Sequence, residues 1–445
     1  AAEVRSGLPF PRQGRLKSRP TVMLRLLHFS DLHIGVENYG RTDPQTGLNT
    51  RLADFLAAYD ELVDYAIANG VHLVLFAGDA YKGRDPSQTH QREFARRVLR
   101  LTQAGIPVVL CVGNHDMPHA PSRASALEIF GVLGVPGVTV GDTLATHRVE
   151  TTAGPVQVVA LPWVRRSALL THEKAQGLTY DQLNDRINDI LTHQIALRAA
   201  ELDPALPAVL VGHVTLSSAT FGSERGMMLG SDYRLLPSAV ARPEFDYVAL
   251  GHIHRRQRLG QSPPAVYSGS LARVDFSEAA EDAKGFMLID LDPSKPRGER
   301  IADLRFQPVA HDRRMVVVEV EVGPQDDPTA KVCDAIRKAP VEGAIVKVIV
   351  RLAAEQAALL DDRAVYTALE PAHYVAAYIR DVRRESRVRL GGQVTESLSP
   401  MEALRLYLDA KKKTPAEAER LLGYARALMA EDGAEAEGED APRLP

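Results

Sequence analysis

The sequence has few of the residues that mark disulfide-stabilised, membrane-spanning or strongly basic proteins. It contains only two cysteines, Cys111 and Cys333, which excludes a disulfide framework or a cysteine-based zinc site and indicates a reducing cytoplasm. No apolar stretch approaches the roughly 20 residues needed to cross a bilayer, so we expect no membrane partner. The formal net charge is −4, so no global positive field attracts nucleic acid, and a nucleic-acid enzyme of this composition needs local basic patches.

Two arginine clusters are candidates for such patches. Arg255, Arg256 and Arg258 lie beside the last of the motifs described below, and Arg165-Arg166 forms the second cluster. Most arginine runs form solvated protein faces, and contact with phosphate is the alternative. Nearness to the motif favours phosphate contact for Arg255 and Arg256.

The middle of the chain has the composition of a globular protein, and both ends differ from it. Hydrophobic residues make up 45% and charged residues 25%, and the length of 445 residues predicts two or three domains. Residues 1–22 are basic and lack an apolar core, so we expect a disordered extension and no secretory signal. Residues 431–445 are acidic and rich in Ala and Gly, which predicts a disordered tail.

Residues 23–300 alternate apolar and amphipathic segments, which predicts an α/β domain with two sheets packed face to face and helices outside. Apolar runs predict strands at residues 24–29, 71–77, 108–112, 156–162, 207–211, 247–250, 265–269 and 285–290. Apolar residues at helical spacing predict helices at residues 51–69, 87–104, 122–130 and 180–201.

Two smaller units follow a composition break at residues 293–300. Residues 313–390 alternate strand and helix patterns, typical of a small α+β domain, and residues 372–382 fit either a strand or a helix. Residues 399–430 predict a helix pair, because Pro400 and Pro415 stand at helix-start positions. The pair has an apolar stripe that either closes a core or meets a partner. The stripe consists of Leu404, Leu408, Leu421, Leu422, Tyr424 and Leu428.

Five short motifs stand where apolar runs end. They are Asp31-Leu32-His33, Gly78-Asp79, Gly113-Asn114-His115-Asp116, Gly212-His213 and Gly251-His252-Ile253-His254. The carboxyl ends of strands are where an open α/β sheet binds its ligands, so one sheet edge collects carboxylates and imidazoles. A single buried histidine is more often a structural hydrogen-bonding group. Five such motifs in order are hard to obtain by accident and indicate a metal site.

Carboxylates and imidazoles with open coordination positions suit a divalent ion that activates water. Asp31 and His33 are two residues apart, a spacing that points both side chains the same way on a strand, and His252 and His254 repeat it. Asp79 is the natural bridging carboxylate. The simplest division assigns one metal ion to Asp31, His33, Asp79 and His254, and a second to Asp79, Asn114, His213 and His252.

His115 is the remaining imidazole. It follows Asn114 directly and cannot easily point at the same metal ion, so it is available as the general acid for the leaving oxygen. Asp116 is expected to hold the tautomer of His115. The predicted reaction is in-line attack of an activated water on phosphorus, with the metal ions neutralising the non-bridging oxygens.

The order of the motifs resembles that of the calcineurin-like metallophosphoesterases. This resemblance implies a two-sheet sandwich with flanking helices, two divalent metal ions and hydrolysis of phosphate esters. The family ligands correspond to Asp31, His33, Asp79, Asn114, His213, His252 and His254, with His115 and Asp116 as the acid and its helper.

Within this superfamily, residues 27–35, 78–79, 107–116, 246–254 and 267–270 resemble the bacterial SbcD nucleases, counterparts of the break-repair nuclease of archaea and eukaryotes. The resemblance implies manganese-dependent cleavage of double-stranded DNA ends, hairpins and single strands. It also implies a DNA-contacting capping domain at residues 313–390, terminal helices that dock on an SbcC-type ATPase, and a homodimer through helices near the third motif. The sequence departs from many relatives at Ala80-Tyr81-Lys82, which puts substrate contacts from this loop in doubt.

Three other functions are compatible with parts of the pattern. A small-molecule metallophosphoesterase, such as a cyclic-nucleotide or nucleotide-sugar hydrolase, would use the same metal motifs, but it needs neither the extra domain nor the helix pair. A scaffold protein with a decayed site disagrees with the retention of every expected ligand. A protein serine/threonine phosphatase is disfavoured, because that family usually continues the Gly-Asn-His motif with Glu, whereas this chain has Asp116.

Overall fold

The computed structural model describes residues 22–118, 123–165, 178–221, 233–280, 283–383, 400–411 and 413–435. The predicted extension at residues 1–22 therefore lies almost wholly outside the described residues, as do Arg166 and the end of the predicted tail. None of the described helices is long and apolar enough to cross a membrane.

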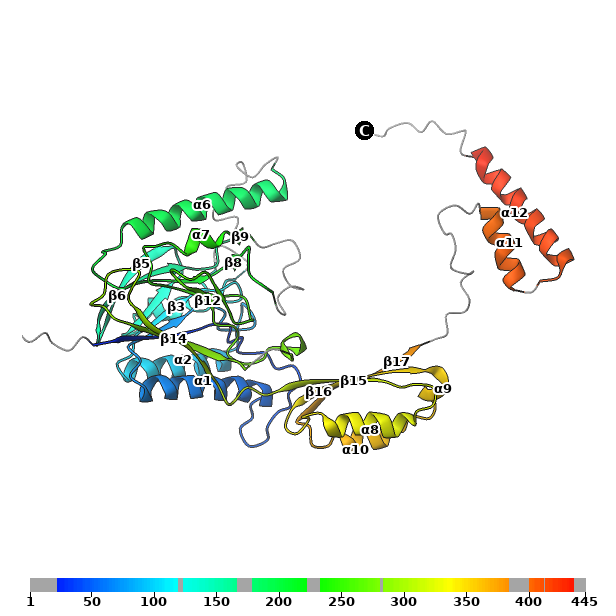
Figure 1. The fold of residues 1–445 in the computed structure, drawn as a ribbon, viewed down its shortest axis with the longest axis horizontal. Coiled ribbons are helices and arrows are strands. Elements are labelled where there is room, and N and C mark those ends of the chain that lie inside the picture. Colours follow the sequence, from blue (N-terminus) through cyan, green and yellow to red (C-terminus); the bar gives the residue numbers. More distant parts are fainter. Residues whose placement is uncertain are drawn as a thin grey trace, which may run out of the picture. The chain divides into compact units, whose positions relative to one another are not determined.

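Two six-stranded sheets form the main body (Figure 1). In the first, the order is β14 (Ile301–Pro308), β13 (Gly285–Leu291), β1 (Leu24–Phe29), β2 (Leu73–Phe76), β3 (Val108–Cys111) and β4 (Val138–Gly141). In the second, it is β11 (Gln257–Leu259), β12 (Ala265–Tyr267), β10 (Tyr247–Gly251), β7 (Ala208–His213), β6 (Gly154–Leu161) and β5 (Ala145–Thr151). The central strands β1–β2–β3 and β10–β7–β6 run parallel, so their carboxyl ends share an edge within each sheet.

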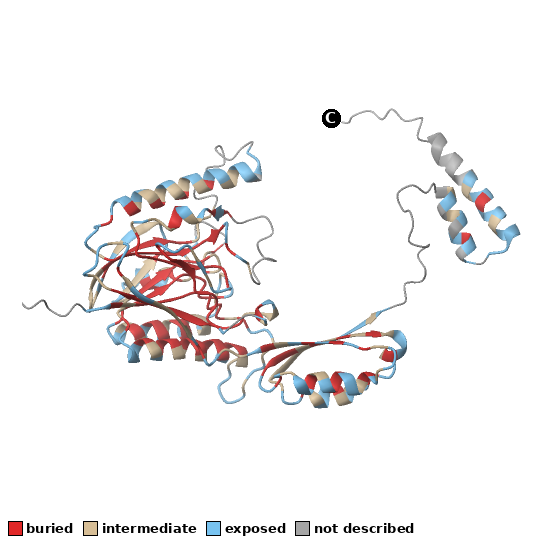
Figure 2. Ribbon diagram, in the orientation of Figure 1, coloured by how far each residue is buried: buried red, intermediate tan, exposed pale blue. Residues whose placement is uncertain are grey.

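The two sheets pack face to face. Leu75 and Val109 of the first sheet belong to one buried cluster with Val158 and Val211 of the second (Figure 2). Each sheet turns its other face toward helices: α1 (Thr50–Ala68) and α2 (Gln88–Gln103) cover the first, and α6 (Tyr180–Ala200) covers the second. This arrangement confirms the predicted α/β sandwich with flanking helices.

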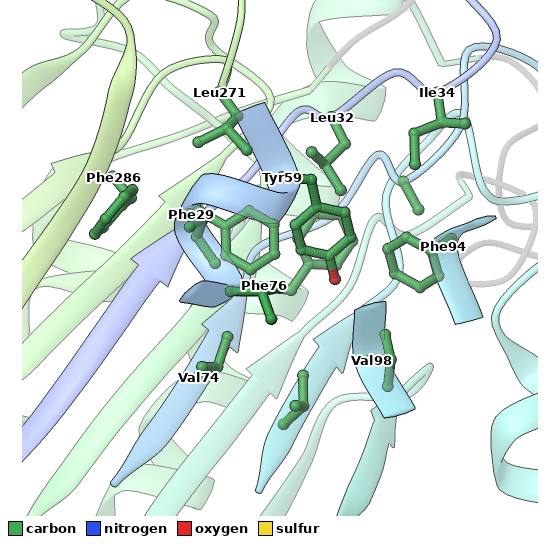
Figure 3. Packing of buried hydrophobic residues seen from close by; sticks show 14 of the residues in the cluster. Phe29, Leu32, Ile34, Tyr59, Val74, Phe76, Phe94, Val98, Leu271 and Phe286 are labelled. Atoms are coloured by element: carbon green, nitrogen blue, oxygen red, sulfur yellow. The ribbon is translucent and has the colours of Figure 1, made fainter. Parts of the chain in front are cut away.

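Aromatic packing joins the first sheet to its helices (Figure 3). The Phe29 ring lies 4.9 Å from Phe76 and 5.5 Å from Tyr59 of α1, measured between centroids. Side-chain caps start the helices: the Asn49 side chain accepts a hydrogen bond from the backbone N–H of Arg51, and Ser87 accepts one from His90. The core and the caps together fix the loops between strands and helices.

Three features of this body differ from the prediction. The helix expected at residues 122–130 is shortened to α3 (Glu128–Val132), because residues 123–125 are not helical and the backbone N–H of Ala126 is donated to the Asp116 carbonyl. Strands β4 and β5 were not predicted. The body also continues past residue 300, since β14 pairs with β13 along its length. Short elements complete it: β8 (Thr215–Leu216), β9 (Arg234–Leu235), α7 (Pro237–Val240) and the 3-10 turn Phe276–Glu278.

A three-stranded sheet follows in the chain, in the order β15 (Met315–Glu321), β16 (Ile345–Ala353) and β17 (Tyr374–Arg383). Its helices are α8 (Pro328–Lys338), α9 (Ala354–Ala357) and α10 (Asp362–Ala368). Val318 and Val320 of β15 are buried and alternate with exposed neighbours, as expected of a strand with one exposed face. The segment that fitted strand or helix is the strand β17.

The helix pair consists of α11 (Pro400–Ala410) and α12 (Pro415–Glu435). Leu408 and Leu422 are buried, whereas Tyr407, Leu421 and Tyr424 are exposed. The helix α12 runs to Glu435, five residues past the predicted end of the pair, so the expected tail begins as helix. The side chain of Leu428 lies outside the described residues.

Candidate metal centre

Four of the predicted ligands lie on left-handed backbone. The φ angles are 52° at Asp31, 47° at His33, 61° at Asp79 and 95° at His252. Such a conformation costs on the order of 1–3 kcal/mol for a non-glycine residue and persists only where the surroundings impose it. The sequence predicted that strand alternation would align Asp31 with His33. In the structure the strand has already ended, and left-handed turns aim these side chains.

Backbone hydrogen bonds hold the first two motif loops together. The N–H of Asp31 is donated to the Gly78 carbonyl at 3.0 Å, and the N–H of His33 to the Asp79 carbonyl at 3.1 Å. Two glycines permit the close packing. A Cβ on Gly78 would lie 2.4 Å from Nδ1 of His213, and one on Gly113 would lie 2.1 Å from Oδ1 of Asp79. The motif glycines therefore allow different loops to meet.

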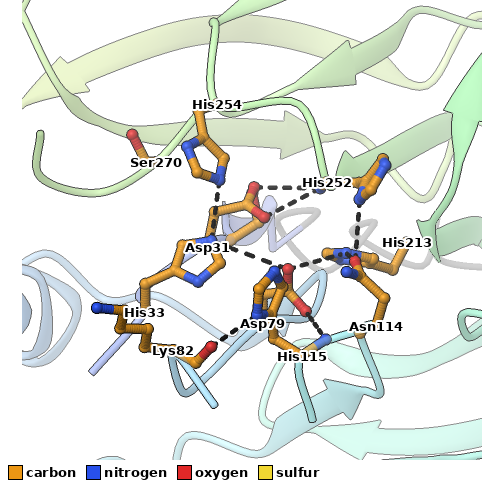
Figure 4. Close-up of polar contacts among 12 residues, drawn as sticks. Asp31, His33, Asp79, Lys82, Asn114, His115, His213, His252, His254 and Ser270 are labelled. Carbon is orange, nitrogen blue, oxygen red and sulfur yellow. Dashed lines mark hydrogen bonds and ion pairs between the residues drawn. The ribbon is translucent and has the colours of Figure 1, made fainter. Parts of the chain in front are cut away.

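Asp31, His33 and His254 form the first group of potential ligand atoms (Figure 4). One donor atom from each lies within 4.8 Å of the others, and Nε2 of His33 lies 2.9 Å from Nε2 of His254. Oδ2 of Asp79 is 3.8 Å from Nε2 of His33. The carboxylate of Asp31 also accepts the backbone N–H of His252 at 3.1 Å, which ties the first motif to the last.

Asp79, His213 and His252 form the second group. Nε2 of His213 lies 3.3 Å from Oδ2 of Asp79. Oδ1 of Asn114 lies 2.9 Å from Nε2 of His213 and 3.0 Å from Nδ1 of His252. All seven predicted ligands thus converge, and Asp79 stands between the two groups.

The buried carboxylates of this cluster are unfavourable in their charged form unless nearby positive charge compensates them. Burial raises the pKa of Asp31. Burial also disfavours charge on His213 and Asp79, but their ion pair outweighs it, so the pKa of His213 rises to about 9 and that of Asp79 falls well below its usual range. Carboxylate, amide and imidazole donors are the set that divalent first-row metal ions accept. The residues therefore fit such cations, which would displace the proton on His213.

His115 lies at the edge of the cluster. Its backbone N–H is donated to Oδ1 of Asp79 at 2.8 Å, and its Nδ1 lies 2.7 Å from the Lys82 carbonyl oxygen. Its ring packs edge-on against His33, with centroids 4.9 Å apart. His33, Asp79 and His115 also form a third group of nearby donor atoms, so distance alone allows His115 to act as a ligand.

The structure gives Asp116 a different set of partners from the one expected. Its carboxylate accepts the backbone N–H groups of Asp79 and Ala80 at 2.9 Å and that of Gly113 at 3.0 Å. Burial, together with the neighbouring Asp79 carboxylate, raises the pKa of Asp116 to about 7. The orienting contact on Nδ1 of His115 comes from the Lys82 carbonyl, and Asp116 joins the second and third motif loops.

One functional candidate carried no sequence signal. The Glu278 carboxylate is fully buried and accepts a hydrogen bond from Nδ1 of His254 at 2.9 Å. Burial opposes its ionisation, but the hydrogen bond from His254 and the charge of Lys284 hold the pKa of Glu278 well below its usual range. Glu278 lies in a polar turn at no strand end, and only the fold brings it to the site.

A cavity of about 430 Å³ adjoins the first group. His254, Arg255, Arg256 and Lys284 contribute to its lining. The guanidinium of Arg256 also lies 4.2 Å from the centre of the Phe306 ring, a cation–π distance. Arg255 and Arg256 thus place positive charge in the described lining of this cavity, next to the predicted ligand His254.

Comparisons with known proteins agree with this geometry. A family model described as "Calcineurin-like phosphoesterase" matches residues 24–256. The chain is 30% identical to the SbcD component of the SbcCD nuclease of Rhodobacter capsulatus, over 60% of this chain and 66% of the relative, and 29% identical to the same component in Escherichia coli, over 58% and 63%. It is 26% identical to "DNA double-strand break repair protein Mre11" of Halobacterium salinarum, over 74% of this chain and 70% of the relative.

The two SbcCD relatives are thus matched over less than two thirds of their length. The family model covers more than half of this chain and spans all five motifs. With the two-sheet sandwich and the convergent carboxylates and imidazoles, this match shows that the chain belongs to the calcineurin-like phosphoesterase family.

Proposed function

We propose that this protein is the nuclease component of an SbcCD-type complex and hydrolyses DNA phosphodiesters with two divalent cations. Both cations of the native protein would be manganese. The observation that carries the proposal is the pair of donor groups that meet at Asp79 beside His115. DNA is the substrate that the names of the relatives suggest. Double-strand exonuclease and hairpin or single-strand endonuclease activities are the expected reactions.

Asp31, His33, Asp79 and His254 would hold one cation, and Asp79, Asn114, His213 and His252 the other. When bound, the cations supply Lewis acidity that activates water and neutralises phosphate charge. His115 would protonate the leaving oxygen, with its Nδ1–H donated to the Lys82 carbonyl. Arg255 and Arg256 line the adjoining cavity and are suited to neighbouring phosphates of the strand.

The test is cleavage of an end-labelled linear duplex and a labelled hairpin, each with manganese or magnesium. We expect metal-dependent cleavage of both DNAs, with manganese the more effective cation. Hydrolysis of a small chromogenic phosphodiester without any cleavage of DNA, even after the ATPase partner is added, would favour the small-molecule phosphoesterase. Absence of all hydrolysis in the presence of metal would sink the proposal.

The helix pair is the proposed docking element for an SbcC-type ATPase. Tyr407, Leu421 and Tyr424 are exposed apolar side chains of this pair, whereas Leu408 and Leu422 are buried among its described side chains. The sheet β15–β17 with its helices is the proposed DNA-contacting capping domain. We propose residues 23–308, 313–383 and 400–435 as the bounds of the three parts, with β14 counted in the first.

Deleting the residues after 399 should abolish capture of a co-expressed ATPase partner while sparing hydrolysis of a small phosphodiester. In the full chain, Tyr424→Ser should weaken ATPase binding by about 30-fold, the effect of losing an interface hot spot of about 2 kcal/mol. Leu359→Ser, which removes an equally exposed apolar residue of the small domain, is the matched control. Unchanged capture of the ATPase by the truncated chain would refute the docking role.

We also propose a homodimer through α2 and α3. Leu99, Ile129, Val132 and Leu133 are exposed apolar side chains of these helices or the residue after them. Val132→Asp should shift the protein from dimer to monomer in sedimentation equilibrium, whereas Leu197→Asp on α6 should not. A wild-type protein that sediments only as a monomer would contradict the proposal.

A further inference from the structure

Glu278 stands at the centre of a buried polar cluster that backs one predicted metal ligand. Oε1 of Glu278 lies 2.9 Å from Nδ1 of His254, and Oε2 accepts the Ser270 hydroxyl at 2.8 Å. Nζ of Lys284 lies 2.6 Å from Oε2 of Glu278 and also donates to the His254 carbonyl at 3.1 Å. The pair Glu278–Lys284 therefore contacts both the ring and the backbone of His254.

Burying a charged group costs free energy unless the group is paired and hydrogen-bonded. The presence of two buried charges beside His254 therefore calls for an explanation. The side chain of Glu278 is fully buried and that of Lys284 is 4% exposed. Each carboxylate oxygen has a donor, and the ammonium has two acceptors, which leaves the pair compensated. An apolar pair would pack here without that cost, but it could not hold the Nδ1–H of an imidazole.

The two donor groups differ in what supports their histidines. Nδ1 of His213, in the second group, lies 2.7 Å from the Ala77 carbonyl oxygen, a neutral acceptor. His254, in the first group, has a carboxylate in the same role. A carboxylate that accepts the far ring N–H fixes the tautomer, orients the ring and makes the imidazole a more basic ligand. The first group should therefore depend on Glu278 in a way that the second does not.

We propose that Glu278, with Lys284 as its counter-charge, is a positioning residue that holds His254 with Nε2 facing the first cation and thereby sets the affinity of that position. The inference rests on the proposed two-cation function. It extends that function by naming a residue outside the five motifs on which only one of the two cations depends.

The test is titration of the full chain with manganese by isothermal calorimetry, after removal of metal. Losing a carboxylate behind a ligating histidine commonly lowers metal affinity by about 10–100-fold. Glu278→Gln should weaken one of two binding events by this factor and leave the other unchanged. Ser270→Ala keeps the charge but removes one orienting hydrogen bond, so it should weaken the same event by a smaller factor.

Asp246→Asn is the matched control. Its carboxylate is equally buried and lies 3.2 Å from the Arg300 guanidinium, but it contacts none of the predicted ligands. The control should keep both manganese affinities even if its melting temperature in chelator falls. If Glu278→Gln does not fold, the manganese titration of Ser270→Ala tests the proposal instead.

Unchanged affinities in Glu278→Gln, or in Ser270→Ala where that variant decides, would overturn the proposal. Equal weakening of both binding events, or a similar loss in Asp246→Asn, would also overturn it, since it would mark a general structural effect. A wild-type protein that binds no manganese would instead refute the proposed function, so the two failures are distinguishable.

Discussion

Replacing Asp79 by Asn is expected to reduce phosphodiester hydrolysis by at least about 10³-fold. Asp79 lies between the two donor groups, with Oδ2 at 3.3 Å from Nε2 of His213 and 3.8 Å from Nε2 of His33. Two bound cations stabilise transition-state charge by several kcal/mol, and about 4 kcal/mol corresponds to this factor. The Asn side chain can still accept the His115 backbone N–H, so the loop conformation should survive.

The measurement is the initial rate on the labelled duplex and on a small phosphodiester, with manganese titration in parallel. Both binding events should weaken, in contrast to the single event expected for Glu278→Gln. The control Asp246→Asn should retain its rate on both substrates. Activity of Asp79→Asn within tenfold of wild type would show that Asp79 is not shared between the cations.

Replacing His115 by Asn is expected to slow DNA cleavage by about 10²–10⁴-fold, the usual contribution of a general acid, while both cations still bind. The effect should depend on the leaving group. An alkoxide of DNA needs a proton as it departs, whereas a nitrophenolate leaves without one. Hydrolysis of a nitrophenyl phosphodiester by His115→Asn should therefore remain close to the wild-type rate.

Calorimetric titration distinguishes this role from metal ligation. His33, Asp79 and His115 form a group of nearby donor atoms, so a ligand role for His115 also has geometric support. Loss of a manganese-binding event in His115→Asn, together with equal loss of rate on both substrates, would place His115 among the ligands. A surface control is His311→Asn, since that ring pairs with Glu61 outside the cluster.

The central strands could be predicted because both of their faces are covered. β2, β3, β7 and β10 are buried at every residue, so each is a continuous apolar run. β14 could not be predicted, because it is an edge strand without any fully buried residue. It also carries two charged residues, Asp303 and Arg305, which form an ion pair. Exposed edge strands share their composition with loops, so the sequence pattern predicts no strand at residues 301–308, where β14 pairs with β13.

The sequence could also predict where the candidate ligands stand in the chain, because each motif lies at the carboxyl end of a buried strand. The backbone conformation that orients these ligands could not be predicted, because an Asp or His residue at positive φ cannot be recognised from the sequence. The predicted contact between Asp116 and His115 rested only on their being neighbours in the sequence. In the structure, the Asp116 carboxylate accepts the backbone N–H groups of Asp79 and Gly113 instead. Glu278 and His254 are 24 residues apart in the sequence, and only the fold brings their side chains into contact.

The left-handed turns narrow the substitutions that this site can tolerate. Asn, Asp and His are the non-glycine side chains most often found at positive φ, and Asp and His are the candidate ligands at these four positions. Glycine would relax the backbone at positions 31, 33, 79 and 252 but would remove the ligand atom. Glutamate would keep a carboxylate but lacks the local backbone hydrogen bond that eases this conformation. At these four positions, coordination chemistry and backbone conformation thus favour the same two residue types, Asp and His.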